Sequence, residues 1–106
     1  MLVKLCKVSE ISEDSPSRFD INGIPIMITK LGNNFFASGA LCTHEEADLT
    51  LGMLSGEVIT CPLHQAKFDL RTGQVLEGPN GTESSTIRSL NGYRVQIVGE
   101  ELWIDL

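Results

Sequence analysis

The placement of the histidines constrains this chain more than any other feature of its sequence. The chain has only two histidines, and each follows a cysteine at short range: Cys42 and His44 form a C-x-H pair, and Cys61 and His64 form a C-x-x-H pair. Two thiolates and two imidazoles make a complete four-ligand set for a metal. A single cysteine is more often a core residue than a ligand, but chance does not readily place every histidine of a chain just after a cysteine. The spacing therefore predicts that two loops bind one metal centre.

The rest of the chain predicts an all-β fold. Short apolar or alternating runs are separated by turn residues such as Asn22-Gly23, which supply the positive φ angles of a tight hairpin. In the last run, Leu102 and Ile104 fall on one face and Trp103 on the other. Many short strands with glycine-rich turns are typical of a sandwich or a small barrel. We expect strands at Val3–Val8, Arg18–Ile21, Pro25–Leu31, Phe35–Ser38, Met53–Leu54, Glu57–Thr60, Lys67–Leu70, Thr86–Leu90, Tyr93–Val98 and Glu101–Leu106.

Length and charge limit the possible functions. With 106 residues the chain forms one domain, and its net charge of −6 argues against nucleic acid and anionic membranes as partners. No apolar run approaches the ~20 residues of a membrane span. Three cysteines cannot all pair, and we interpret Cys6 as a small residue of a strand. We expect a soluble protein of the cytoplasm, a monomer.

Zinc is the strongest physical competitor for the four ligands, because it accepts a Cys₂His₂ set. The usual zinc finger, however, pairs cysteine with cysteine and histidine with histidine, whereas each loop here contributes one of each. Mixed Cys–His loops resemble those of the Rieske proteins, in which a [2Fe-2S] cluster has one iron bound by two thiolates and the other by two imidazoles. The segment from Cys61 to Leu70 resembles the second cluster loop of that family and its following strand. Gly78-Pro79 matches the family's proline loop.

The resemblance covers essentially the whole chain and implies a Rieske fold. It implies an antiparallel β-sandwich base at residues 1–39 and 84–106, with a small cluster-binding subdomain of two loops at about 40–83. It also implies one [2Fe-2S] cluster per chain. Carried over by position, the inner iron is bound by Cys42 and Cys61 and the outer iron by His44 and His64.

The resemblance also implies which kind of Rieske protein this is. High-potential members carry a disulfide between their cluster loops, and here the matching positions are Ala47 and Leu63. Those members also place hydroxyl donors where this chain has Ala66 and Phe68. Losing such donors lowers the potential, and the nearby acidic residues Glu45, Glu46 and Asp48 act in the same direction. Within the range of about −150 to +300 mV known for Rieske centres, we expect a value near the bottom.

The expected function follows from this resemblance. The chain is similar to small Rieske-type ferredoxins, which pass single electrons from a reductase to a terminal oxygenase, commonly one that hydroxylates aromatic rings. No catalytic motif of its own is present, so we predict an electron-transfer protein and not an enzyme. The acidic flank of the first loop predicts basic partner surfaces. Two alternatives remain: a Rieske-like small subunit of a larger reductase such as nitrite reductase, and a zinc-stabilised binding module.

One residue departs from the family pattern. Many members have glycine after the second histidine, and this chain has Gln65. If that position needs a positive φ, glutamine costs roughly 1 kcal/mol there.

Overall fold

The computed structural model describes residues 1–106, and ten strands dominate it. Four one-turn 3-10 helices lie between them, at Val8–Glu10, Leu49–Leu51, Pro79–Gly81 and Ser84–Thr86. The all-β prediction is therefore confirmed. The strands are β1 (Leu2–Lys7), β2 (Ser17–Ile21), β3 (Ile24–Leu31), β4 (Asn34–Gly39), β5 (Met53–Ser55), β6 (Val58–Thr60), β7 (Lys67–Asp69), β8 (Val75–Glu77), β9 (Gly92–Val98) and β10 (Glu101–Asp105).

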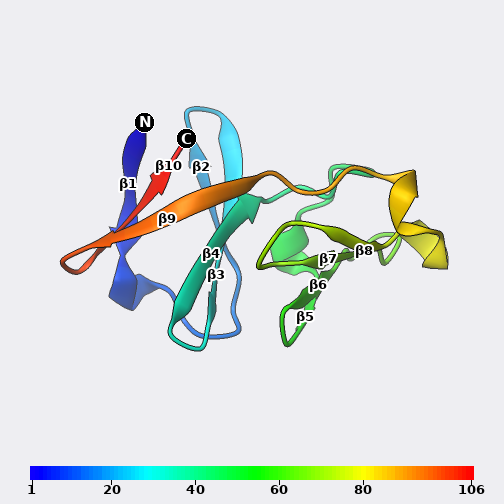
Figure 1. Ribbon diagram of the computed structural model, residues 1–106, viewed down its shortest axis with the longest axis horizontal. Coiled ribbons are helices and arrows are strands. Elements are labelled where there is room, and N and C mark those ends of the chain that lie inside the picture. Colours follow the sequence, from blue (N-terminus) through cyan, green and yellow to red (C-terminus); the bar gives the residue numbers. More distant parts are fainter.

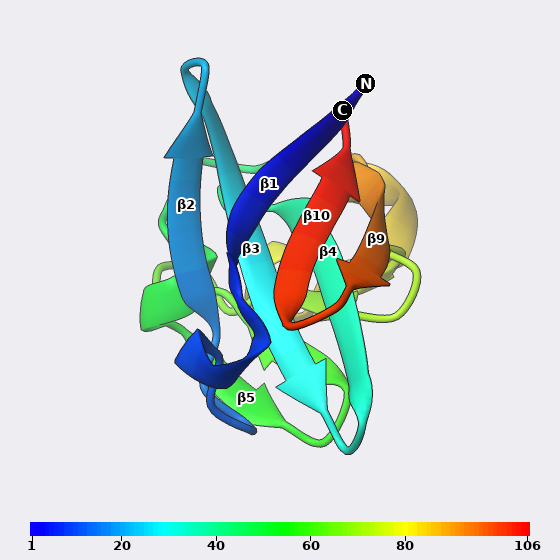
Figure 2. The same ribbon diagram turned by 90° about the vertical axis from the view of Figure 1, so that its left-hand side faces the viewer.

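Six strands form one antiparallel sheet in the order β1-β10-β9-β4-β3-β2. The sheet curls over, so that β1 and β10 lie in front of β3 and β4 in Figure 2. The two layers enclose a core whose fully buried members include Ile26, Ile28, Leu102 and Ile104. Cys6 belongs to this core as a buried residue of β1, as its sequence context predicts.

The remaining strands form a smaller sheet in the order β5-β6-β7-β8. It extends to one side of the large sheet, giving an elongated molecule of 42 × 27 × 19 Å, and the chain between β8 and β9 lies at the far end (Figure 1). Its core centres on Ile59 and Phe68, both fully buried, and includes Cys42 and Cys61. Each cysteine thus has a packed apolar layer behind it. The exact division into a base at 1–39 and 84–106 and a subdomain at 40–83 stays a prediction.

The sequence patterns locate most strands correctly. The hairpin at Asn22-Gly23 has φ angles of 52° and 80°, as the predicted turn requires. The face assignment of the last strand also holds, since Leu102 and Ile104 are fully buried. The short strand β8 has no clear signal in the sequence and was not predicted.

The predicted strand Thr86–Leu90, with a turn at Asn91-Gly92, is wrong. The chain makes a 3-10 turn at Ser84–Thr86 and then runs extended without a partner strand. Its backbone instead bonds to two separate segments: the Leu90 amide donates to the Gly73 carbonyl (2.7 Å), and the Asn91 carbonyl accepts from the Gly39 amide (2.9 Å). Strand β9 begins at Gly92 because β4 offers it a partner there. Tertiary contacts, which local propensity does not show, decide this segment.

Candidate metal centre

The first loop follows β4 and carries one Cys–His pair. The Cys42 amide donates to the Ala47 carbonyl and the Glu46 amide to the Cys42 carbonyl, both at 2.8 Å. Closing so tight a loop needs a left-handed residue, and Glu46 has φ 57°. The far end is fixed by Asp48, whose carboxylate accepts from the Thr50 amide (2.9 Å) and hydroxyl (2.6 Å).

The charge of Asp48 is held in place by its neighbours. Partial burial opposes ionisation of this carboxyl, but the hydrogen bonds from Thr50 and from the Arg18 guanidinium (3.2 Å) outweigh it. The net effect is a pKa below the usual range of an aspartate. The first loop therefore ends on a stable negative charge that is neutralised in part by Arg18.

The second loop, between β6 and β7, repeats the same backbone turn. The Cys61 amide donates to the Ala66 carbonyl at 2.8 Å, and Gln65 takes the left-handed conformation with φ 62°. This position does need a positive φ, so glutamine is strained there by an amount on the order of 1 kcal/mol. Each loop thus spans six residues from its cysteine to an alanine, with the strained residue fifth.

The two cysteines lie together on the buried side of the loops. Cys42 is 1% exposed and Cys61 3% exposed, and their thiols are within hydrogen-bonding reach of each other. Burial raises the pKa of the Cys42 thiol, while the backbone amides of His44 and Glu45 act in the opposite direction. A metal that binds here has to displace the thiol protons, because thiolates are the ligands.

The two histidines lie together on the exposed side. Their ring centroids are 5.2 Å apart with the rings inclined at 70°, and their side chains are 34% (His44) and 38% (His64) exposed. Glu45 reaches across from the first loop, with its carboxylate 3.0 Å from Nε2 of His64 and 3.9 Å from Nε2 of His44. Sequence reasoning considered Glu45 only as a nearby charge and missed this contact.

The two loops therefore bring the predicted ligands together in two pairs, a buried thiol pair and an exposed imidazole pair. This donor set suits a diiron–sulfur unit with chemically different irons, because soft thiolates and neutral imidazoles are segregated to two sides. Ala66 and Phe68 are both buried beside the second loop and carry no hydroxyl group. All three cysteines are free, and the loops are not joined by a disulfide.

A third segment, residues 78–87, covers the second loop. The Asn80 amide donates to the His64 carbonyl at 2.7 Å, and Pro79 is buried. The segment and His44 together line a shallow hollow. Gly78-Pro79 had marked this segment in the sequence, whereas the backbone bond from Asn80 has no sequence signal.

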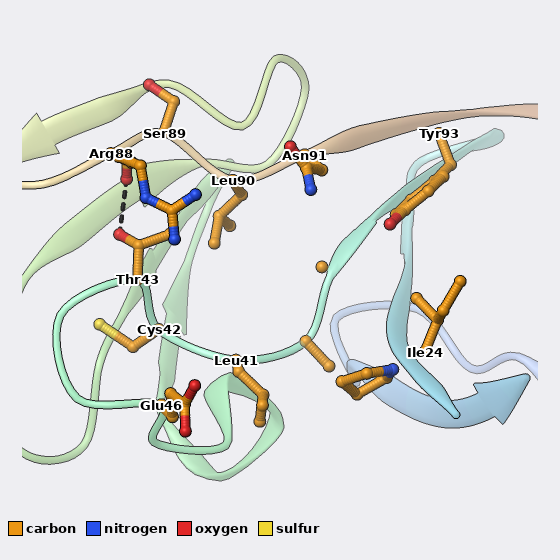
Figure 3. A pocket seen from close by; sticks show the side chains of 13 residues that line it. Ile24, Leu41, Cys42, Thr43, Glu46, Arg88, Ser89, Leu90, Asn91 and Tyr93 are labelled. Carbon is orange, nitrogen blue, oxygen red and sulfur yellow. Dashed lines mark hydrogen bonds between the residues drawn. The ribbon is translucent and has the colours of Figure 1, made fainter. Parts of the chain in front are cut away.

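The first loop has a different support. Its Thr43 hydroxyl donates to the Arg88 carbonyl at 2.5 Å, drawn as a dashed line in Figure 3. The loop borders a cavity of about 220 Å³ that reaches from Cys42 to Ile24 and Tyr93 of the large sheet (Figure 3). The bond ties the first loop to the chain that leads into β9.

Comparisons with known proteins agree with this geometry. Residues 1–97 match the Rieske [2Fe-2S] domain, and the chain therefore belongs to that family. It is 30% identical over 105 residues to the ferredoxin component of biphenyl 2,3-dioxygenase from Rhodococcus jostii, covering 99% of this chain and 92% of that protein. It is 33% identical to the ferredoxin component of a naphthalene 1,2-dioxygenase system from Pseudomonas aeruginosa, covering 92% and 88% of the two chains.

Solved structures give the same result. The ferredoxin of Sphingomonas yanoikuyae B1 superposes with a TM-score of 0.87 at 26% identity, over 100% of this chain and 99% of that one. The ferredoxin of carbazole 1,9a-dioxygenase from Nocardioides aromaticivorans superposes with a TM-score of 0.83 at 29% identity, over 98% and 96%. The predictions of a Rieske fold and of a ferredoxin-type electron carrier are confirmed. None of the helices has the length and apolar character needed to cross a bilayer.

Proposed function

We propose that this chain carries single electrons from a reductase to a terminal oxygenase of the aromatic-ring-hydroxylating type. The observation that carries the proposal is the segregated ligand set: a buried thiol pair packed on a core, and an imidazole pair at the surface. A carrier has to insulate its redox group from water while leaving one edge accessible to partners. The relatives favour this carrier over a zinc module or a reductase subunit, because they are ferredoxin components of dioxygenase systems.

Each of the four ligands has a defined part in this proposal. Cys42 and Cys61 supply thiolates on the buried side, and His44 and His64 supply imidazole nitrogens on the exposed side. When bound, a [2Fe-2S] cluster supplies reversible one-electron chemistry. The histidine rings keep their outer edges at the surface, where a partner docks. Because the chain has only two histidines, it holds one such set and one cluster.

The acidic residues beside the first loop define the partner surface that we propose. Glu45 and Glu46 are exposed beside the histidines, and the whole chain has a net charge of −6. Such a surface favours reductases and oxygenases with basic docking faces. A solved complex of the oxygenase and ferredoxin of carbazole 1,9a-dioxygenase contains a ferredoxin similar to this chain. The two superpose with a TM-score of 0.84 at 29% identity, over 97% of this chain and 91% of that one. Electron transfer should slow as salt concentration rises.

We place the carrier in the cytoplasm and its potential at the low end for Rieske centres. Free thiols at Cys6, Cys42 and Cys61 suit a reducing compartment. Ala66 and Phe68 offer no hydroxyl group to a bridging sulfide or to a cysteine sulfur, and a lost donor destabilises the more negative, reduced state. A low potential suits a carrier that feeds an oxygenase.

The experiment measures iron and acid-labile sulfide in the purified chain, with an EPR spectrum of the dithionite-reduced sample. Two irons and two sulfides per chain, with a Rieske-type signal, are expected. Reconstitution with a ring-hydroxylating oxygenase and its reductase should then restore NADH-driven product formation in proportion to the added chain. A folded, iron-free protein that contains zinc would refute the proposal.

A further inference from the structure

We infer that Glu45 is a positioning residue for the exposed imidazole pair: its carboxylate, from the first loop, holds the ring of His64 in the second. The inference rests on the proposed function, because it concerns ligands of the same cluster. It goes further in separating Glu45 from the other acidic residues nearby. Neither Glu46 nor Asp48 makes a hydrogen bond to a histidine, whereas the Glu45 carboxylate makes one to His64.

The first argument is the distance. The Glu45 carboxylate lies 3.0 Å from Nε2 of His64, which is within the range of a hydrogen bond, and 3.9 Å from Nε2 of His44, which is beyond it. A carboxylate can only accept, so Nε2 of a neutral His64 has to be the donor. The proton on Nε2 leaves Nδ1 with its lone pair free. Glu45 thereby selects the tautomer of His64 that can bind iron through Nδ1.

The second argument is the matching geometry of the two loops. Both share the same cysteine-to-alanine backbone bond and the same left-handed fifth residue. Counted from the cysteine, Glu45 and His64 both stand fourth. The fourth residues of the two loops therefore contact each other. In the first loop this residue is Glu45, and in the second it is His64.

The third argument is that Glu46 provides a contrast. It carries the same charge one residue further along, yet its carboxylate forms no hydrogen bond or ion pair, and the residue lines the cavity on the other flank of the loop (Figure 3). If charge alone mattered, Glu45 and Glu46 would differ in their effect on the cluster only through their distance from it. A carboxylate bonded to a metal-bound imidazole makes that ring a stronger donor, which stabilises the oxidised metal and lowers the potential.

The test compares Glu45→Gln, Glu45→Ala and Glu46→Gln in the cluster-loaded protein. Both substitutions at position 45 remove the same charge, but only glutamine keeps an acceptor for Nε2. We expect Glu45→Ala to raise the reduction equilibrium constant about tenfold, which is ~59 mV for one electron. Glu45→Gln should give a smaller increase, about threefold, and Glu46→Gln the smallest.

A second readout is the rate at which a chelator removes iron. Losing the partner of a ligand histidine typically costs a metal site about 10-fold in affinity or more. Glu45→Ala should therefore lose iron faster than Glu45→Gln, and Glu46→Gln should match the unchanged protein. Equal potentials for the two variants at position 45 would overturn the inference, whatever the chelator shows. Failure of the proposed function is distinguishable, because the unchanged protein would then contain no iron or sulfide.

Discussion

The two ligand loops have the same backbone but different sequences. Both close with a bond from the cysteine amide to an alanine carbonyl, and both place a left-handed residue before that alanine. The histidine, however, stands third in the first loop and fourth in the second. In the first loop the fourth position is Glu45, and in the second the third position is the exposed Leu63. One turn geometry therefore serves two motifs, and the position of the histidine distinguishes them.

The loops also differ in what supports them. The first is held by side chains, with Thr43 bonded to the Arg88 carbonyl and Asp48 bonded to Thr50. The second is held by backbone, through the bond from the Asn80 amide to the His64 carbonyl. Because side chains support the first loop, point mutations can remove its supporting hydrogen bonds one at a time. The segment 78–87, which covers the second loop, is more sensitive to changes in backbone geometry.

The largest expected effect comes from removing the cysteine of either loop, which tests whether both thiolates are required for the cluster. Cys42→Ala and Cys61→Ala should each abolish the cluster, because three ligands leave one iron without its second thiolate. Iron and acid-labile sulfide per chain measure the loss. Cys6→Ala, which removes a thiol from the large-sheet core, is the control and should keep full iron and sulfide. Retention of a full cluster by either loop variant would falsify the ligand assignment.

The next effect tests the histidines one loop at a time. His64→Cys and His44→Cys should each lower the potential, on the order of 100 mV, since an anionic thiolate replaces a neutral imidazole. A potentiometric titration followed by EPR measures the shift. If His44→Cys left the potential of a fully loaded cluster unchanged, the two loops would not contribute equally to the site.

A smaller effect concerns the cover of the second loop. In Gly78→Ala the added Cβ would collide with the hydroxyl groups of Thr82 and Thr86 and the Glu83 carbonyl. The segment would have to shift, at a cost of about 1–3 kcal/mol in the free energy of unfolding. Urea titration measures it. Gly39→Ala, where nothing lies within 4 Å, is the control, and a similar loss in both variants would contradict the explanation.

The smallest effect tests the shared turn itself. Gln65→Gly and Glu46→Gly should each raise the free energy of unfolding by up to about 0.5 kcal/mol, because relief of about 1 kcal/mol of positive-φ strain is offset in part by the extra freedom that glycine gives the unfolded chain. Gln74→Gly, at a position without positive φ, should lower it by about 0.5–1 kcal/mol. A gain at only one of the two loop positions would show that the turns are not equivalent in energy.

Much of this protein was predictable from local features of the sequence. The Asn22-Gly23 hairpin depends on two residues that tolerate positive φ, and the face of β10 depends on simple alternation. The Cys–His pairs were informative because each lies within a single loop, where spacing limits geometry. The wrong strand at 86–90 lies where backbone bonds run to distant segments. The missed strand β8 is only three residues long and pairs with the neighbouring β7 across an irregular register, so it leaves little periodic pattern in the sequence.

The sequence by itself determined the all-β class and the candidate ligands, because periodicity, turn residues and short spacings act over a few residues. Tertiary structure alone decided that the thiols face the core while the imidazoles face the solvent. It also placed Glu45 of one loop against His64 of the other, 19 residues further along the chain. The reason is physical: the two loops adopt similar turns, and the hairpin of β5 and β6 between them brings residues distant in sequence into contact.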